Sequence, residues 1–365
     1  MRFHALLPLI GLASAFPPTW SNNSRTPNRI QALQEDPAPP SSPTPAASPL
    51  SFSATSHQNL AVYYGKTDLS VTTDLTTICQ DPSIDIVILG FLLNILGPGG
   101  LPTMALNNTN GELCEGPNAS MLSAGGTNMR RCEKLEQGIK DCQAAGRKIF
   151  ISVGGAKGTQ FFSSQAEAET AATVLWDLFG HGTGLNKSLR PFGESTTVDG
   201  FDIDNETTSG NYWPEMAAKL RQLTNSQNEK KYFLSAAPAC YFPTPAAPLQ
   251  MLQMVDFVWP QFYGAPSCNL GSSNFFPSIS AWADRLKPAS GPRPKLYIGG
   301  ASWDGGAKGG YVPAQELNRT IVETVDKLGT ERFGGVMLWD AAYGVANVDA
   351  EGRSIVEVAK ESLLV

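Results

Sequence analysis

The sequence predicts an α/β fold, a (β/α)8 TIM barrel, for one folded domain that covers residues 58–365. Eight short runs rich in β-branched and aromatic residues recur in this range, and segments with helical periodicity separate them. Runs such as IDIVILGFL and GGVMLW are apolar without interruption, which is typical of parallel strands covered by helices. A doubly wound open sheet is the main alternative, but no G-x-G-x-x-G motif follows the first run.

The eight runs predict the strands of the barrel. They span residues 60–64, 85–91, 148–153, 200–204, 232–236, 257–262, 295–298 and 335–339. Functional side chains of such a barrel lie at the carboxyl ends of its strands, so we expect the functional site there.

Three of the helices between these strands have recognisable ends. The S-x-x-E sequence at 164–167 predicts a capping box before a helix over 168–179. A proline begins the helix expected over 214–223, and Gly329 ends the one expected over 313–328. Strands and helices therefore alternate, as a barrel requires.

The first 57 residues differ in composition from the rest of the chain. Residues 1–15, MRFHALLPLIGLASA, combine a basic Arg2, an apolar run and an A-x-A site, which predicts a secretory signal peptide. A first core helix is the alternative, and Pro8 argues against it. Residues 16–57 contain nine prolines and twelve Ser or Thr, which predicts a Pro/Ser/Thr-rich disordered linker or a pro-segment.

The charge balance argues against polyanionic partners. The formal net charge is −6, so no global positive field attracts nucleic acid or an anionic membrane. No uninterrupted apolar stretch after the N-terminus is long enough to span a bilayer. We therefore expect a soluble, secreted protein, extracellular or associated with the cell wall, that binds neither nucleic acid nor membrane.

All six cysteines lie in the folded range. An even number in an exported chain predicts three disulfides, and the spacing leaves their pairing open. A zinc site is the alternative, but the sequence has no C-x-x-C and few histidines. Sequons at Asn107, Asn118, Asn186 and Asn318 predict a glycosylated surface.

The fourth predicted strand is the most informative about chemistry. In VDGFDIDNE, residues Asp202, Asp204 and Glu206 occupy every second position, and the apolar Phe201 and Ile203 alternate with the first two. Their side chains therefore point to one face of the strand, at the mouth of the barrel. Repulsion among close carboxylates raises at least one pKa and thereby supplies a proton donor near neutral pH. A Ca²⁺ or Mg²⁺ site and a solvated acidic turn are the alternatives, and the regular alternation favours neither. Asp199 falls on the opposite face, where we expect structural support.

These residues resemble a known family. DGFDIDNE matches the D-x-x-D-x-D-x-E signature of glycoside hydrolase family 18, and the surrounding segments resemble its class III, hevamine-like chitinases of plants and fungi. The segments AVYYG, ISVGG, LSAAPAC, VWPQFYGAPSC, GGYVP and FGGVMLW occur in family order. Gly154 and Gly155 end the ISVGG motif, and we expect a structural role for both.

The resemblance implies hydrolysis of β-1,4-linked N-acetylglucosamine with retention and with assistance from the substrate. Glu206 would protonate the glycosidic oxygen while the acetamido oxygen of the substrate attacks the anomeric carbon. Asp204 would orient the acetamido nitrogen, and Asp202 would share a proton with Asp204. No cofactor and no metal are implied.

Four further side chains are assigned by the same resemblance. Tyr263 would donate a hydrogen bond to the acetamido carbonyl, and Trp339 would lie under the sugar at the cleavage site. Gln261 and Tyr63 would line the cleft.

The resemblance also implies a disulfide pairing. The expected pairs are Cys79 with Cys142, Cys114 with Cys132, and Cys240 with Cys268.

The sequence departs from the class III pattern at several cleft positions. Tyr64, Lys66 and Gly264 stand where the pattern has tryptophan, glutamine and asparagine, which affects the expected subsites rather than the acid chemistry. Asn205 stands where a bulky apolar residue is more common, and with Thr207 it forms a sequon that we expect to be shielded.

The resulting expectation is a secreted, monomeric endo-chitinase acting on chitin or chitooligosaccharides. A chitin-binding lectin or inhibitor on the same scaffold is one alternative, although the acidic residues that such proteins usually lose are present. An endo-β-N-acetylglucosaminidase acting on N-glycans is the other.

Overall fold

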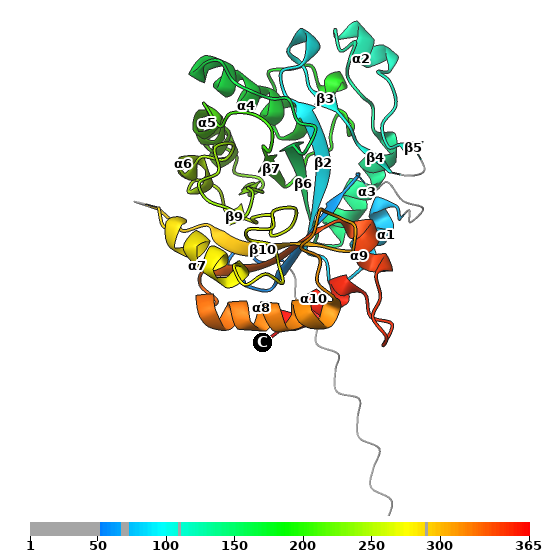
Figure 1. The fold of residues 1–365 in the computed structure, drawn as a ribbon. Helices are drawn as coiled ribbons and strands as arrows, with labels where there is room; N and C mark the ends of the chain where they lie inside the picture. The colour runs from blue at the N-terminus through cyan, green and yellow to red at the C-terminus, as the bar shows by residue number, and fades with distance from the viewer. Residues whose placement is uncertain (1–51, 67–72, 109–110, 289–290) are drawn as a thin grey trace, which may run out of the picture. The chain divides into compact units, whose positions relative to one another are not determined.

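The computed structural model describes residues 52–66, 73–108, 111–288 and 291–365 (Figure 1). The predicted signal peptide and most of the predicted linker lie outside these residues. Residues 52–57, which the sequence analysis assigned to the linker, pack against the barrel, with the Phe52 ring centroid 5.2 Å from that of Phe233 and 6.1 Å from that of Phe257. Across the described ranges, no helix is both long and apolar enough to cross a membrane.

The described residues form a closed barrel of eight parallel strands, as predicted. The ring closes because β1 pairs in parallel with both β2 and β11. The barrel strands are β1 (Asn59–Tyr64), β2 (Ile86–Asn94), β6 (Lys148–Gly154), β7 (Gly200–Asp204), β8 (Phe233–Ala236), β9 (Phe257–Val258), β10 (Lys295–Ala301) and β11 (Phe333–Trp339). A short antiparallel strand, β3 (Thr103–Met104), extends the sheet beyond β2, and β4 (Asn107–Asn108) pairs with β5 (Gly111–Glu112) outside the barrel.

Strand β9 is shorter than the predicted strand over 257–262. Pro260 has no backbone N–H to donate to a ladder, so continuous pairing stops before it. Pairing resumes as isolated bridges from Gln261 to Ala239 and to Gly299. Gln261 therefore keeps its place in the barrel wall, although it lies beyond the regular strand.

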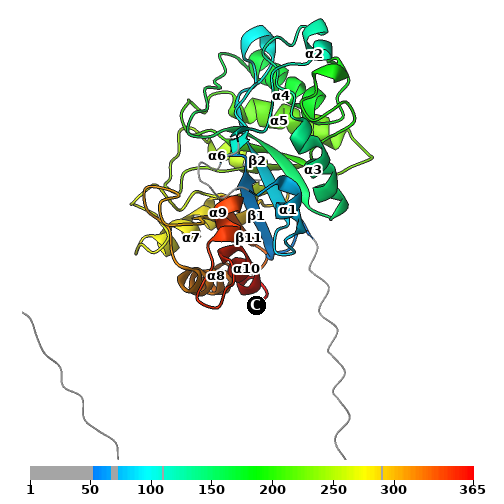
Figure 2. The ribbon, with the colours of Figure 1, turned by 90° about the vertical axis from the view of Figure 1, so that its right-hand side faces the viewer.

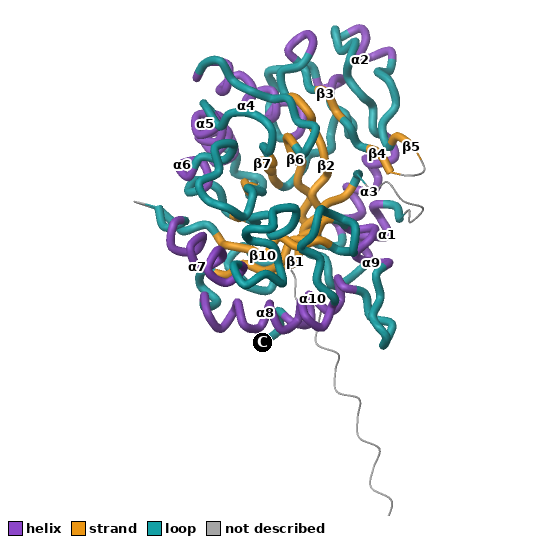
Figure 3. Tube along the Cα trace, in the orientation of Figure 1, coloured by secondary structure: helices purple, strands orange, loops and turns teal. Residues whose placement is uncertain are grey.

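The helices lie outside the ring of strands, as the purple and orange segments of Figure 3 show. Figure 2 shows α8 and α10 next to each other near the C-terminus. The helices are α1 (Leu75–Gln80), α2 (Ala119–Ser123), α3 (Glu133–Ala144), α4 (Gln165–Phe179), α5 (Trp213–Asn225), α6 (Leu249–Leu252), α7 (Phe275–Arg285), α8 (Ala314–Leu328), α9 (Ala341–Ala346) and α10 (Ile355–Ser362).

The expected ends of α4 and α8 are close to those observed. Gly329 follows α8 with φ +75°, a conformation that favours glycine. The Ser164 side chain caps α4 by accepting from the Glu167 backbone N–H, but the Glu167 carboxylate accepts from the N–H of Ser163 rather than Ser164. The predicted capping box is thus only half formed.

Two layers of apolar side chains fill the domain. One lies between the strands and the helices, and the other fills the barrel interior with large rings. The rings of the inner layer include Phe150, Phe233, Phe257, Trp259 and Tyr297. Because the interior is packed, a ligand has room only at an end of the barrel.

Three aspartates fix the strand register at the amino end of the barrel. Each one accepts a backbone N–H from a neighbouring strand and pairs with a buried or half-buried cation. Asp85 accepts the N–H of Leu60 at 2.7 Å and pairs with Lys360 at 2.6 Å. Asp199 accepts the N–H of Ile149 at 2.9 Å and pairs with Lys230 at 3.0 Å. Asp256 accepts the N–H of Leu234 and pairs with Arg221, each at 2.8 Å. Asp199 therefore lies at the end of β7 opposite Glu206.

The three disulfides have the pairing that the resemblance implies. They join Cys79 to Cys142, Cys114 to Cys132, and Cys240 to Cys268. The third links the loop after β8 to the loop after β9, and both loops border the carboxyl end of the barrel.

Candidate active site

Asp202 is the buried centre of the candidate site. Parallel register aligns it with Ser152 on β6 and Ser235 on β8. Its carboxylate accepts from the hydroxyls of Ser152 (2.6 Å), Ser235 (2.7 Å) and Tyr63 (2.7 Å). Burial raises the pKa of Asp202, and these three donors oppose that rise.

Ser152 and Ser235 are not among the site residues predicted from the sequence. Both are hydroxyl residues in otherwise apolar strands, and both occupy inward-facing positions of the barrel. A buried hydroxyl needs a hydrogen-bond partner. A lone serine in an apolar strand therefore indicates a polar group inside the barrel, and this could have identified both residues from the sequence.

Asp204 and Glu206 follow Asp202 on the same face of the chain. Gln261 Nε2 lies 2.8 Å from Asp204 Oδ1 and 3.4 Å from Glu206 Oε1, so its amide donates toward both carboxyl groups. Burial, followed by the negative charges of Glu206 and Asp202, raises the pKa of Asp204 well above its usual value. Burial also raises the pKa of Glu206. The pair therefore keeps a proton to a higher pH than two isolated carboxyl groups would.

Close backbone contact fixes the position of Asp204. The N–H of Gly155 donates to the Asp204 carbonyl oxygen at 2.8 Å. A Cβ added to Gly154, whose φ is +118°, would lie 2.0 Å from that same oxygen. A Cβ on Gly155 would lie 2.8 Å from the Phe91 ring. Gly154 is thus required for β6 to approach the end of β7, and Gly155 leaves room for the Phe91 ring on β2.

The Gly154→Ala substitution is expected to destabilise the fold by about 3 kcal/mol or more, because the new methyl group overlaps the Asp204 backbone and neither strand can move aside. Chemical denaturation of the folded domain measures this loss. Gly146→Ala is the matched control, since Gly146 also has positive φ (+82°) but has open space around its Cβ position. We expect it to cost only about 1 kcal/mol, from backbone strain. Equal losses in the two variants would contradict the steric explanation.

An aromatic cluster lies beside the carboxylates. The ring centroid of Trp339, at the end of β11, is 5.4 Å from that of Tyr63 and 5.9 Å from that of Phe91. Trp339 is only half-buried, so part of its ring is accessible at the barrel mouth. Phe91 was missed by the sequence analysis because its strand is apolar throughout, which hides a residue that faces the site.

Tyr263 is also at the carboxyl end of the barrel. Burial and the negative charges of Asp204, Glu206 and Asp202 raise the pKa of its phenol well above the usual value. The hydroxyl therefore stays protonated and can donate a hydrogen bond to a ligand.

Asn205 connects the loop after β7 to the loop after β8. The side chain is buried, and its amide donates to the carbonyl oxygens of Ala246 (2.8 Å) and Thr208 (3.1 Å). This explains why a polar residue occupies the position between the two acids.

No metal-ligating cluster of three or more His, Cys, Asp or Glu side chains occurs in the part of the chain that the structure describes. The polar groups at the barrel mouth are a carboxyl pair with raised pKa values, a third carboxylate with three hydroxyl donors, an amide and a phenol. This set can transfer a proton, accept an N–H and donate to a carbonyl oxygen.

Comparison with protein-family models matches residues 59–299 to glycosyl hydrolases family 18. The chain belongs to this family. Two proteins that are similar to this chain are named as chitinases. Endochitinase 3 of Metarhizium robertsii is 36% identical over 295 residues, which cover 80% of this chain and 89% of that protein. The crystal structure of a chitinase from Ipomoea carnea is 28% identical with a TM-score of 0.66, covering 83% of this chain and 99% of that one.

Structural similarity alone does not separate enzymes from inhibitors here. A xylanase and α-amylase inhibitor protein from Scadoxus multiflorus has a similar structure, with 25% identity and a TM-score of 0.64 over 84% of this chain and 98% of that one. The function therefore has to be inferred from the residues at the barrel mouth.

Proposed function

We propose that this family 18 protein is an endo-acting chitinase that hydrolyses β-1,4 linkages between N-acetylglucosamine units with retention. The observation that supports this most directly is the row of Asp202, Asp204 and Glu206, in which Gln261 donates toward the last two. The endochitinase names of its relatives agree with this proposal.

The reaction begins with Glu206 in its protonated form. It donates its proton to the glycosidic oxygen, and the bond from that oxygen to the anomeric carbon breaks. The acetamido oxygen of the same sugar attacks that carbon, which forms a cyclic oxazolinium ion. Water then attacks the anomeric carbon and gives up a proton to the Glu206 carboxylate, while the bond from that carbon to the acetamido oxygen breaks and reforms the neutral acetamide. The acid is restored, and two inversions leave the configuration retained.

Asp204 and Tyr263 act on the acetamido group. The Asp204 carboxyl accepts the N–H, orients the group and stabilises its positive charge. The Tyr263 hydroxyl donates to the acetamido oxygen. Asp202 shares a proton with Asp204 and is held by Ser152, Ser235 and Tyr63, so no reorganisation is needed during the reaction. The apolar face of the sugar stacks on Trp339.

An inhibitor or lectin function is less well supported. A binding protein has no need for a carboxyl pair with raised pKa values at the end of a barrel strand, and this chain has one. We further propose that residues 1–15 direct export, in agreement with three disulfides in the folded domain. We propose that the enzyme acts as a monomer.

The test is incubation of the protein with a chitin hexamer, with separation of product lengths and anomers at short times. We expect internal cleavage with products that are first released as β-anomers. α-Anomers would contradict the retaining mechanism. Binding of the hexamer without cleavage would favour a lectin, and release of glycans from a glycoprotein but not of oligomers from chitin would favour an endo-β-N-acetylglucosaminidase.

A further inference from the structure

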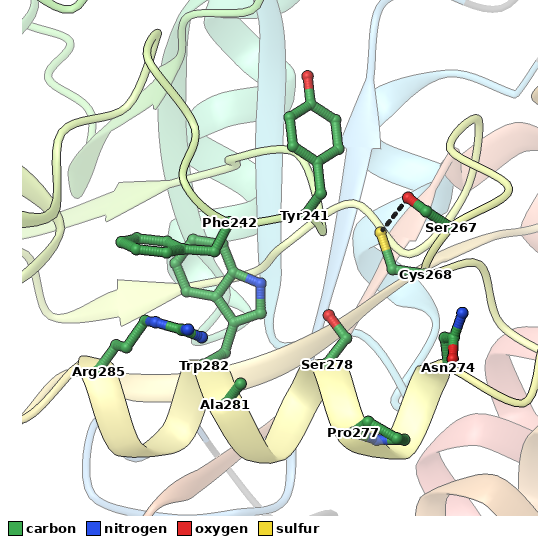
Figure 4. Close-up of a pocket in the computed structure, with 10 residues that line it drawn as sticks. All are labelled: Tyr241, Phe242, Ser267, Cys268, Asn274, Pro277, Ser278, Ala281, Trp282 and Arg285. Carbon is green, nitrogen blue, oxygen red and sulfur yellow. Dashed lines mark hydrogen bonds between the residues drawn. The ribbon is translucent and has the colours of Figure 1, made fainter.

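A pocket of about 310 Å³ lies between helix α7 and the loop after β8 (Figure 4). None of the carboxylates of the candidate active site lines it. Its walls are Tyr241, Phe242, Ser267, Cys268, Asn274, Pro277, Ser278, Ala281, Trp282 and Arg285. The volume is at the lower end of the range for small-molecule sites, about 300–1,000 Å³, and suits a single sugar unit.

The walls of this pocket are held in place by several contacts. The carbonyl oxygen of Cys240 accepts from Ser278 Oγ and from Trp282 Nε1, each at 2.8 Å, which ties the loop to α7. The disulfide from Cys240 to Cys268 ties the same loop to the loop after β9. The Phe242 ring packs edge-on against Trp282 at 5.6 Å. The pocket is therefore preformed, and a ligand need not order it.

The chemistry of the walls is that of a sugar-binding site. Tyr241 is 49% exposed, and Figure 4 shows its ring pointing away from α7, free to stack on the apolar face of a pyranose. Ser267 and Asn274 add a hydroxyl and an amide at the opposite end from Phe242. The guanidinium of Arg285 lies 4.4 Å from the Phe242 ring centroid, a cation–π contact that engages the one charged side chain of the lining. The remaining polar groups are neutral, which favours a neutral ligand over an anion.

The loop that carries Tyr241 and Phe242 into the pocket wall starts beside the active site. Ala239, two residues before Tyr241, forms a β-bridge with Gln261, whose amide reaches the catalytic carboxyl pair. Both places therefore border the carboxyl end of the barrel, where a long polymer can extend beyond the cleavage position. Since the proposed substrate is such a polymer, one of its sugar units is the ligand that suits the pocket.

We propose that this pocket is an accessory site for an N-acetylglucosamine unit of chitin outside the cleavage position. Tyr241 stacks on the sugar, and Asn274 and Ser267 bond its hydroxyl or acetamido groups. This proposal rests on the proposed function, and it adds a second point of attachment that holds the enzyme on the insoluble polymer.

Equilibrium binding to insoluble chitin tests the site. The Tyr241→Ala substitution is made in a Glu206→Gln background, so that the polymer is not degraded during the measurement. We expect the dissociation constant to rise about five- to tenfold relative to Glu206→Gln alone, which corresponds to loss of one stacking contact of roughly 1 kcal/mol. Ala281→Phe, which fills the pocket and leaves Tyr241 in place, is expected to cause a similar loss.

Phe161→Ala is the matched control, since Phe161 is 61% exposed, precedes α4 and does not line the pocket. Its binding is expected to stay within twofold of the parent. Unchanged binding in Tyr241→Ala, or an equal loss in Phe161→Ala, would overturn the accessory site. Hydrolysis of a soluble tetramer with Glu206 intact is measured separately. If the unsubstituted protein does not hydrolyse the tetramer, the proposed function is overturned, whatever the binding results for the accessory site.

Discussion

The Glu206→Gln variant is expected to hydrolyse a chitin hexamer about 10³- to 10⁴-fold more slowly than the unsubstituted protein. Glutamine has nearly the same shape as a protonated glutamate, and it still accepts from Gln261, so the barrel mouth keeps its structure. It has no acidic proton to give to the glycosidic oxygen, which then has to leave as an unprotonated alkoxide. Initial rates on the hexamer measure the loss.

Binding and stability measurements complete this experiment. The Glu206→Gln variant is expected to bind the hexamer within a few-fold of the unsubstituted protein and to unfold at the same denaturant concentration. Glu229→Gln is the matched control, because Glu229 is a surface carboxylate with an 81% exposed side chain. Its rate is expected to be unchanged. A Glu206→Gln variant with near-normal turnover would show that another group donates the proton.

The Asp204→Asn variant is expected to lose about 10²- to 10³-fold in kcat. Asp204 is buried next to Glu206, and Gln261 donates to it at 2.8 Å, so its charge acts in a poorly solvated place. The positive charge that develops on the acetamido group during ring closure loses its nearest counter-charge in the amide variant. Because this interaction strengthens as the reaction proceeds, the loss falls on kcat more than on KM.

Steady-state kinetics on the hexamer separate the two parameters. Asp326→Asn, an exposed aspartate on α8, is the control and is expected to leave both unchanged. A loss confined to KM would mean that Asp204 only binds the ground state. A loss of stability as large as that of Gly154→Ala would mean that the substitution acts through the fold.

The strands could be predicted because each barrel strand is a short apolar run bounded by turn residues, and a closed parallel sheet imposes that pattern on every one of them. Prediction was less accurate where a single residue changes the backbone hydrogen bonding. The predicted strand continues to Phe262, but the ladder stops before Pro260, which has no N–H. In the expected capping box, the Glu167 carboxylate accepts the N–H of Ser163 instead of that of Ser164.

The acidic residues could be predicted because their alternation is local, whereas their partners are distant in sequence. Ser152 and Ser235 meet Asp202 only through strand register, and Phe91 meets Trp339 only because the sheet closes. Periodicity within a single segment carries no information about such pairs. The cysteines of each disulfide are also distant in sequence, so their spacing did not predict the pairing, which came from the family resemblance.

The hydrogen bond from Tyr63 to Asp202 has a consequence for how activity is acquired during folding. The two residues are 139 positions apart, on β1 and β7, and β1 is also the strand that closes the ring against β11. Partial barrels built from neighbouring strands can align Ser152, Asp202 and Ser235, but Tyr63 reaches Asp202 only when β1 and β7, which are not paired in the sheet, face each other across the barrel interior. Contacts of such long range form late and slowly. Regain of hydrolysis after dilution from denaturant therefore reports when β1 and β7 come together across the barrel, an event later than the recovery of helix content.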